Sequence, residues 1–261
     1  MLDESVKKSI EKLHSHEREQ VEAAVRELAA RFPELSEVDY RAAVEALCSL
    51  FYVDTYERAD LEPALDAAVA VLAREGVRVV PLLLEFMQGS DIKSHLFLAT
   101  ALGQIGPPAL PALRRSIATA DDPYSRSFAL FALGKLRHPQ VHEALPEVIG
   151  SLMHPDKEVR DSASRVIGKI AEVVTPDLLS ERRRHEIFEA AMRALDDHQP
   201  AVRAKVVRSL GKLAAAGYLD DAERDTLRTT LRRLLGEDEH YDWDRAYIVR
   251  REAEEALTHV R

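Results

Sequence analysis

Three arginines recur along the chain in a pattern that could bind phosphate groups. Arg126, Arg160 and Arg203 each stand eight positions before a glycine, and guanidinium groups are strong phosphate ligands. Each arginine, however, also follows an acidic residue of a turn, and these residues are Asp122, Asp156 and Asp197. We therefore interpret the six residues as a structural ladder, in which carboxylates along neighbouring turns pair with the guanidinium groups.

The acidic segment GEDEHYDWDRAY (residues 236–247) could bind a hard cation. Its candidate ligands are Asp238, His240, Asp242 and Asp244. Their spacing matches no calcium loop, and the central glycine of such a loop is missing. We interpret the segment as a solvated or partner-contacting loop and predict no metal site.

Nothing else in the sequence indicates catalysis. Cys48 is the only cysteine, which excludes an intramolecular disulfide and a cysteine-rich metal site. It stands among apolar residues without a nearby base, so we predict a small core residue. A glycine-rich phosphate loop, a serine nucleophile elbow and a paired-carboxylate motif are all missing. We therefore expect no catalytic residues and no cofactor.

Helices must position all of these residues. The 10 glycines and 12 prolines lie between runs rich in Ala, Leu, Glu and Arg. These runs place apolar residues at helical spacing, as in residues 21–32 and 65–73. Since no segment alternates apolar and polar residues as a half-buried strand does, the sequence predicts an all-α fold.

A two-helix unit recurs along the chain. The glycines of the longer helices lie 31, 34 and 43 residues apart, at Gly103, Gly134, Gly168 and Gly211. A shorter helix precedes each longer one and often carries a proline, as at Pro81, Pro111 and Pro146. One helix pair cannot bury its own apolar face, so neighbouring pairs must stack into a continuous core.

The repeated motifs resemble the HEAT-repeat family, in particular the short bacterial and archaeal repeats also found in phycobilin lyases. The segments DDPYSRSFALFALGKL (121–136) and LATALGQIGPPALPAL (98–113) carry the resemblance. It implies a right-handed α-solenoid with about five helix pairs over residues 76–261. We expect residues 1–75 to form an N-terminal helical cap or degenerate repeats, in which residues 39–50 resemble a second helix.

The charge is unevenly distributed. The whole chain has a formal charge of -9, but residues 1–75 contain 9 Lys+Arg against 17 Asp+Glu and so carry -8 of it. An acidic protein is a poor general binder of nucleic acid, which needs a basic face. The sequence also has no signal-peptide pattern and no apolar run of the ~18 residues that a membrane span requires. We therefore expect a cytoplasmic protein without a nucleic-acid or membrane partner.

The resemblance also implies a binding surface, because second helices line the concave face of HEAT-like solenoids. Outward positions of these helices change from aromatic to basic along the chain. They are Phe97, Phe128, Phe131, Lys135, Arg165, Lys169, Lys205, Arg208 and Lys212. Such a surface suits a peptide that carries apolar and acidic residues. The alternative interpretation is that the phenylalanines lie in the core and the basic residues form a solvated face, because a shift of one position in helix phase would bury the phenylalanines. We therefore predict a non-catalytic protein-interaction scaffold that binds a protein or peptide partner.

Two alternatives come from the same resemblance. One is a HEAT-like enzyme or enzyme subunit, either a di-iron hydroxylase or a bilin lyase. In the hydroxylase His-Glu pairs of second helices bind iron, whereas the pairs here, His16–Glu17, His142–Glu143 and His185–Glu186, lie at the starts of first helices or in the N-terminal segment. The other alternative is a structural subunit of a larger assembly.

Overall fold

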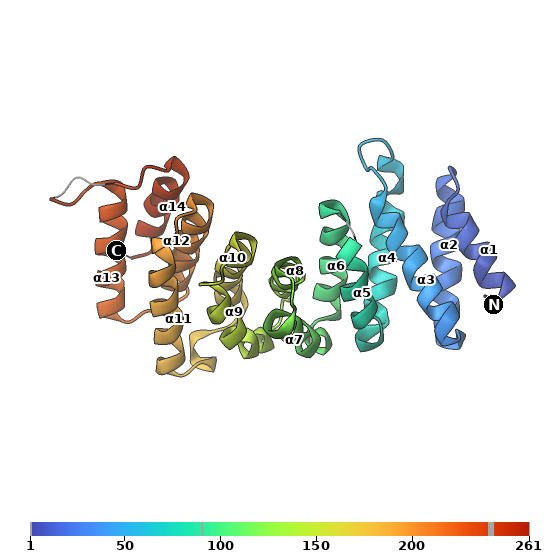
Figure 1. The fold of residues 1–261 in the computed structure, drawn as a ribbon, viewed down its shortest axis with the longest axis horizontal. Coiled ribbons are helices and arrows are strands. Elements are labelled where there is room, and N and C mark those ends of the chain that lie inside the picture. The colour runs from blue at the N-terminus through green and yellow to red at the C-terminus, as the bar shows by residue number, and fades with distance from the viewer. Residues whose placement is uncertain (1, 90, 240–242, 261) are drawn as a thin grey trace. The chain divides into compact units, whose positions relative to one another are not determined.

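The computed structural model describes residues 2–89, 91–239 and 243–260, and every secondary-structure element in these ranges is a helix (Figure 1). This confirms the all-α prediction. The chain divides into two compact units, Met1–Ala112 and Leu113–Arg261. The predicted boundary at residue 75 lies inside the first unit.

Within residues 2–89 and 91–109, the first unit contains six α-helices joined by short 3-10 segments or turns. They are α1 (Glu4–Leu13), α2 (Arg18–Arg31), α3 (Glu37–Ser49), α4 (Glu62–Arg74), α5 (Val80–Phe86) and α6 (Ile92–Ile105). Helices α2, α4 and α6 pack on one another in sequence, and α3 packs on both α1 and α5. The segment 39–50 therefore lies in the first-helix layer with α1 and α5, which corrects its interpretation as a second helix.

The second unit repeats this two-layer arrangement. Helix α7 (Leu110–Thr119) leads into it, and its other helices are α8 (Pro123–Leu133), α9 (Leu145–Ser151), α10 (Lys157–Val173), α11 (Glu181–Arg193), α12 (Pro200–Ala215), α13 (Asp221–Leu235) and α14 (Tyr247–Leu257). The second helices α8, α10, α12 and α14 pack side by side in order, while α9 packs on α11. We call α8, α10, α12 and α14 the second-helix layer.

Capping side chains fix where the second helices begin. Asp122 accepts a hydrogen bond from the backbone N–H of Ser125 (2.7 Å) at the start of α8. Asp156 accepts bonds from the N–H groups of Glu158 (2.8 Å) and Val159 (3.3 Å) at the start of α10. These carboxylates satisfy N–H groups that have no partner within the helix.

Two of the repeated glycines, Gly168 and Gly211, lie where neighbouring second helices approach one another closely. A Cβ atom on Gly168 of α10 would stand 2.7 Å from the hydroxyl oxygen of Ser209 on α12. That hydroxyl donates a 2.7 Å hydrogen bond to the backbone carbonyl of Ser164 and is buried, so it has little freedom to move. Similarly, a Cβ atom on Gly211 would stand 3.0 Å from Cβ of Ala256 on α14.

Among the described residues, no single helix is long and apolar enough to cross a membrane; one bent pair, residues 93–105 with 107–119, meets the length and composition criteria together.

We predict that Gly168→Ala destabilises the protein although alanine favours helices. The added methyl group would overlap the Ser209 hydroxyl, and overpacking of this kind costs about 1–3 kcal/mol. Urea unfolding followed by circular dichroism measures the change. Gly150→Ala in α9 is the matched control: no atom lies within 4 Å of the new Cβ, so this variant should gain roughly 0.5–1 kcal/mol from helix propensity. Equal effects of the two variants would contradict the packing role of Gly168.

Candidate protein-binding surface

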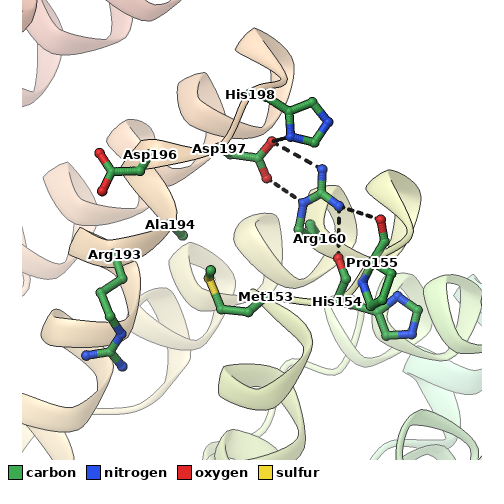
Figure 2. Close-up of a pocket in the computed structure, with 9 residues that line it drawn as sticks. All are labelled: Met153, His154, Pro155, Arg160, Arg193, Ala194, Asp196, Asp197 and His198. Atoms are coloured by element: carbon green, nitrogen blue, oxygen red, sulfur yellow. Dashed lines mark hydrogen bonds and ion pairs between the residues drawn. The ribbon is translucent and has the colours of Figure 1, made fainter.

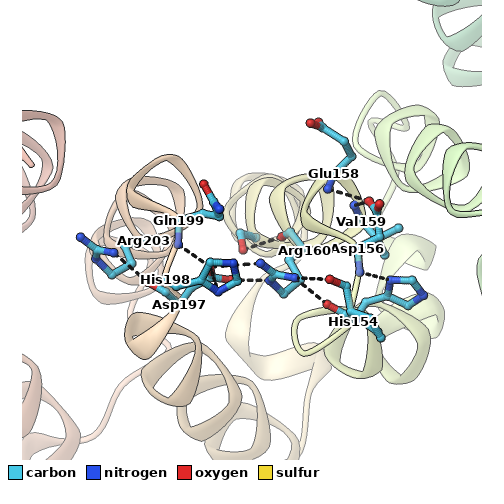
Figure 3. A network of polar contacts seen from close by, with 11 residues as sticks. His154, Asp156, Glu158, Val159, Arg160, Asp197, His198, Gln199 and Arg203 are labelled. Carbon is cyan, nitrogen blue, oxygen red and sulfur yellow. Dashed lines mark hydrogen bonds and ion pairs between the residues drawn. The ribbon is translucent and has the colours of Figure 1, made fainter.

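An arginine ladder connects the turns that precede the second helices (Figure 3). The guanidinium group of Arg160 donates to both carboxylate oxygens of Asp197, at 2.5 and 3.2 Å. It also donates to the carbonyl oxygens of His154 and Pro155, both at 2.8 Å. One repeat later, Arg203 donates to the carboxylate of Asp244 at 2.7 and 2.8 Å and to the carbonyl of Asp197 at 2.7 Å. Each arginine thus bonds its own turn and the carboxylate of the next.

The spacing of these partners differs from the pattern read in the sequence. Asp197 and Asp244 stand six residues before Arg203 and Arg250, the arginines of their own helices. Asp122 and Asp156 stand only four residues before theirs, and the structure places them at helix caps, without a hydrogen bond to an arginine side chain in the described residues. Asp244 was not recognised as a ladder residue from the sequence, although the six-residue spacing would have indicated it.

His154 stands six residues before Arg160, at the repeat position that Asp197 and Asp244 occupy in the next two repeats. Its Nδ1 accepts a hydrogen bond from the N–H two residues later (3.1 Å), as the carboxylates of Asp197 and Asp244 do (both 2.8 Å). Among the described residues, Arg126 consequently has no carboxylate opposite it. In the described part of the chain its guanidinium makes one hydrogen bond, to the carbonyl of Ala120 at 2.7 Å.

The ladder carboxylates are buried and remain charged. The side chains of Asp197 and Asp244 are 4% and 6% exposed. Burial raises the pKa of each carboxyl, but the bonds from Arg160 and Arg203 outweigh it and hold both pKa values below the ordinary one. The Arg160–Asp197 pair also forms one edge of a cavity of about 370 Å³, whose other lining includes Met153, Arg193 and Asp196 (Figure 2). Because Arg160 and Asp197 form an ion pair with each other, we assign this edge of the cavity a structural role.

A second set of sequence-predicted residues lies on α6, α8, α10 and α12. Phe128 is 4% exposed and packs in the core, which corrects its assignment to a binding surface; the phase of α8 turns it inward. In the first unit, Phe97 is half-buried and stacks on Phe51 with ring centroids 5.0 Å apart. Phe131 is half-buried in the second unit, and Nζ of Lys135 lies 5.2 Å from its ring centroid.

Most of the predicted basic residues have carboxylate partners within the second-helix layer. Lys205 bonds Asp161, and Arg208 bonds Glu252 at 2.6 and 2.8 Å. Glu172 accepts bonds from Lys212 at 2.6 Å, Arg137 at 2.9 Å and Lys169 at 3.1 Å. Although burial opposes it, these three cations lower the pKa of Glu172 to about 2. The internal pairs neutralise much of the expected basic strip.

A positively charged pocket remains between α8 and α10. Its volume is about 170 Å³, and its lining residues are Phe131, Gly134, Lys135, Arg137, Ser162, Arg165, Val166 and Lys169. Arg165 lies 3.5 Å from Asp161, and Lys135 has no ion-pair partner among the described residues. Burial lowers the pKa of Lys135, and so do the nearby charges of Lys169, Arg137 and Arg165. The pocket therefore combines an aromatic ring with uncompensated positive charge.

The other candidate residues of the sequence lie apart from this pocket. No group of three or more His, Cys, Asp or Glu side chains that could hold a metal ion occurs within residues 2–89, 91–239 and 243–260. His185 bonds Glu223 (2.8 Å) and His142 bonds the carbonyl of Pro139 (2.9 Å). In the acidic loop, Asp244 belongs to the ladder, while His240 and Asp242 lie outside the described residues.

Cys48 lies in the core, as predicted. Its side chain is buried, and burial raises the pKa of its thiol to about 12. The thiolate, which is the nucleophilic form, is therefore negligible near neutral pH.

Stacked helix pairs of this kind define the α-solenoid class, and comparisons with known proteins agree. Residues 115–187 match the family of HEAT repeats. Among solved structures, importin beta is 16% identical with a TM-score of 0.60, and Kap95p bound to RanGDP is 17% identical with a TM-score of 0.58. The alignments cover 98% of this chain but only 36% and 35% of those chains, so this chain spans about a third of their length. The predicted resemblance to the HEAT-repeat family is thus confirmed.

The CpcE–CpcF complex of phycocyanin lyase from Nostoc sp. PCC7120 is 23% identical, with a TM-score of 0.44; the alignment covers 64% of this chain and 98% of that one. No curated protein matches this chain.

We predict that Asp197→Asn lowers the free energy of unfolding by about 3 kcal/mol at pH 7, because Arg160 then stays buried without its countercharge. The pKa of Asp197 is depressed by folding, so its contribution is complete above the unfolded value of ~3.9 and is lost as pH falls through the folded value. Urea titrations at several pH values should show wild type and variant converging below pH ~4. A difference that does not change between pH 7 and pH 3 would contradict the assignment.

We further predict that His154→Asp stabilises the protein by up to about 1 kcal/mol, since the new carboxylate gives Arg126 the partner that Arg160 and Arg203 already have. The matched control is the same substitution in an Arg126→Gln background, where the gain should vanish. Thermal unfolding of the four proteins of this double-mutant cycle at pH 7 measures the coupling. An equal gain in both backgrounds would show that the stabilisation does not come from Arg126.

Proposed function

We propose that this chain is a non-catalytic scaffold that binds a segment of another protein through the second-helix layer of residues 113–261. The observation that carries the proposal is the pocket between α8 and α10, in which Lys135 and Arg165 lie beside the half-exposed ring of Phe131. A partner segment with an acidic side chain next to an apolar one matches this combination.

Charge explains why such a partner gains free energy there. Lys135 lies among three further cations, Arg137, Arg165 and Lys169, and their mutual repulsion is relieved when a carboxylate enters. A charge-assisted hydrogen bond in a partly buried pocket is also stronger than one at an open surface. The same geometry repels basic segments, so it gives specificity as well as affinity.

Related structures support a binding role. The Kap95p structure describes a solenoid of this fold bound to another protein, RanGDP. The chemistry of the present pocket is argued from its own residues, because a likeness at 17% identity concerns the fold.

The choice of variants follows from the internal ion pairs. Arg208 and Lys212 bind Glu252 and Glu172, so reversing their charges would break contacts between α12 and its neighbours. Lys135 has no such partner, and the contact of Arg165 with Asp161 is long, at 3.5 Å. Reversing these two charges changes the pocket with the least effect on the stacking of helices.

We predict that selection from a random peptide display library on the folded protein enriches peptides in which Asp or Glu adjoins Leu, Phe or Ile. The double variant Lys135→Glu/Arg165→Glu should lose this enrichment, because the pocket then repels carboxylates. The double variant Arg182→Glu/Arg193→Glu on α11, whose side chains are 89% and 62% exposed, is the control of equal charge change. Enrichment of acidic peptides that is equal for all three proteins, or no acidic preference in the wild type, would contradict the proposal.

A further inference from the structure

The second-helix layer already binds carboxylates of its own at each helix junction after α10. Between α10 and α12, Asp161 holds Lys205 and Glu172 holds Lys212. Between α12 and α14, Glu252 holds Arg208. The cations of this surface are thus arranged so that an acidic side chain bridges neighbouring second helices.

The junction between α8 and α10 lacks the equivalent carboxylates beside Phe131. Lys135 and Lys169 both follow the repeated glycine of their helices, but three residues later Lys169 has Glu172 and Lys135 has His138. The position two residues after the repeated arginine also differs between helices. In α14 it is Glu252, two residues after Arg250, but in α10 it is Ser162, two residues after Arg160. A small serine in place of a glutamate leaves the space that the pocket occupies.

From this comparison we infer that the pocket is a receptor for a single carboxylate, the side chain of one Glu or Asp of the partner segment. Lys135 and Arg165 donate to its oxygens, and its aliphatic carbons lie against the ring of Phe131. This inference rests on the proposed function and specifies the chemistry of its central contact.

The size of the pocket supports one side chain as the occupant. Its volume of about 170 Å³ corresponds to that of roughly six water molecules at ~30 Å³ each. A space of this size suits a single side chain such as that of glutamate.

Glu172 supplies the internal precedent for a carboxylate. Two of its three partners, Arg137 and Lys169, also line the pocket, so the rim of this site already coordinates one carboxylate in the folded chain. The part of the pocket that remains open is the part lined by Lys135 and Arg165, where no carboxylate of the described chain reaches Lys135.

The first test fills the site from within the chain. Ser162→Glu should place a carboxylate in the pocket, at the position equivalent to that of Glu252 on α14. Ser162→Gln fills a similar volume without adding charge. We expect Ser162→Glu to have a higher thermal unfolding temperature than Ser162→Gln and to bind display-selected acidic peptides at least tenfold more weakly than the wild type. A Glu variant no more stable than the Gln variant would overturn the inference.

The second test observes Lys135 directly. Carbon-13 NMR of labelled lysine side chains can be recorded while acetyl-Leu-Glu-Leu-amide, its Gln analogue or its phosphoserine analogue is added, with Lys135→Arg assigning the resonance. The Glu peptide should raise the pKa of Lys135, because a bound anion stabilises the charged amine, and the Gln peptide should leave it unchanged. A larger effect of the phosphoserine peptide would overturn the assignment to a carboxylate.

The outcomes separate this inference from the proposed function. If acidic peptides are selected, but the Glu peptide does not raise the pKa of Lys135 and Ser162→Glu does not weaken binding of the selected peptides, the partner binds elsewhere on the layer and only the inference is wrong. If no acidic peptide is selected while the Glu peptide raises the pKa of Lys135, the pocket is a carboxylate receptor and the proposed partner class is wrong.

Discussion

The close approach of neighbouring second helices is the constraint on which the rest of this structure depends. Gly168 and Gly211 leave no room for a side chain against α12 and α14, so the apolar faces of these helices meet directly. Polar groups at the same junctions must then satisfy one another. The ladder pairs Arg160–Asp197 and Arg203–Asp244 do this at the start of the helices, because the carboxylate side chains are almost fully buried.

The same closeness determines which charges are available to a partner. Where a carboxylate of one second helix faces a cation of its neighbour, as Glu252 faces Arg208, the two groups form an ion pair within the chain and are not available to a partner. Where the facing residues are Phe131 and Ser162, Lys135 contacts the Phe131 ring and has no carboxylate partner in the described chain. The candidate site is therefore a junction that lacks one element of an otherwise repeated ionic pattern.

The sequence predicted the helices and their pairing well, because the repeated glycines and helix caps are local signals. It predicted the ion pairs less well. Lys205 and Asp161 are 44 residues apart, so their contact depends on the rotation of two helices that no local pattern specifies. For the same reason Phe128 was assigned to the surface although α8 turns it into the core. Asp122 and Asp156 cap helices and do not pair with arginines, because the pairing aspartates stand six residues, not four, before the arginine of their own helix.

In the proposed complex, one carboxylate of the partner pairs with Lys135. A double-mutant cycle tests it most directly: affinities are measured for wild type and Lys135→Gln against the selected acidic peptide and its version with that Glu or Asp made neutral. We expect the acidic side chain to strengthen binding to the wild type at least tenfold and to have little effect on binding to Lys135→Gln. Equal losses in both proteins would contradict it, because independent effects show that the two groups do not interact.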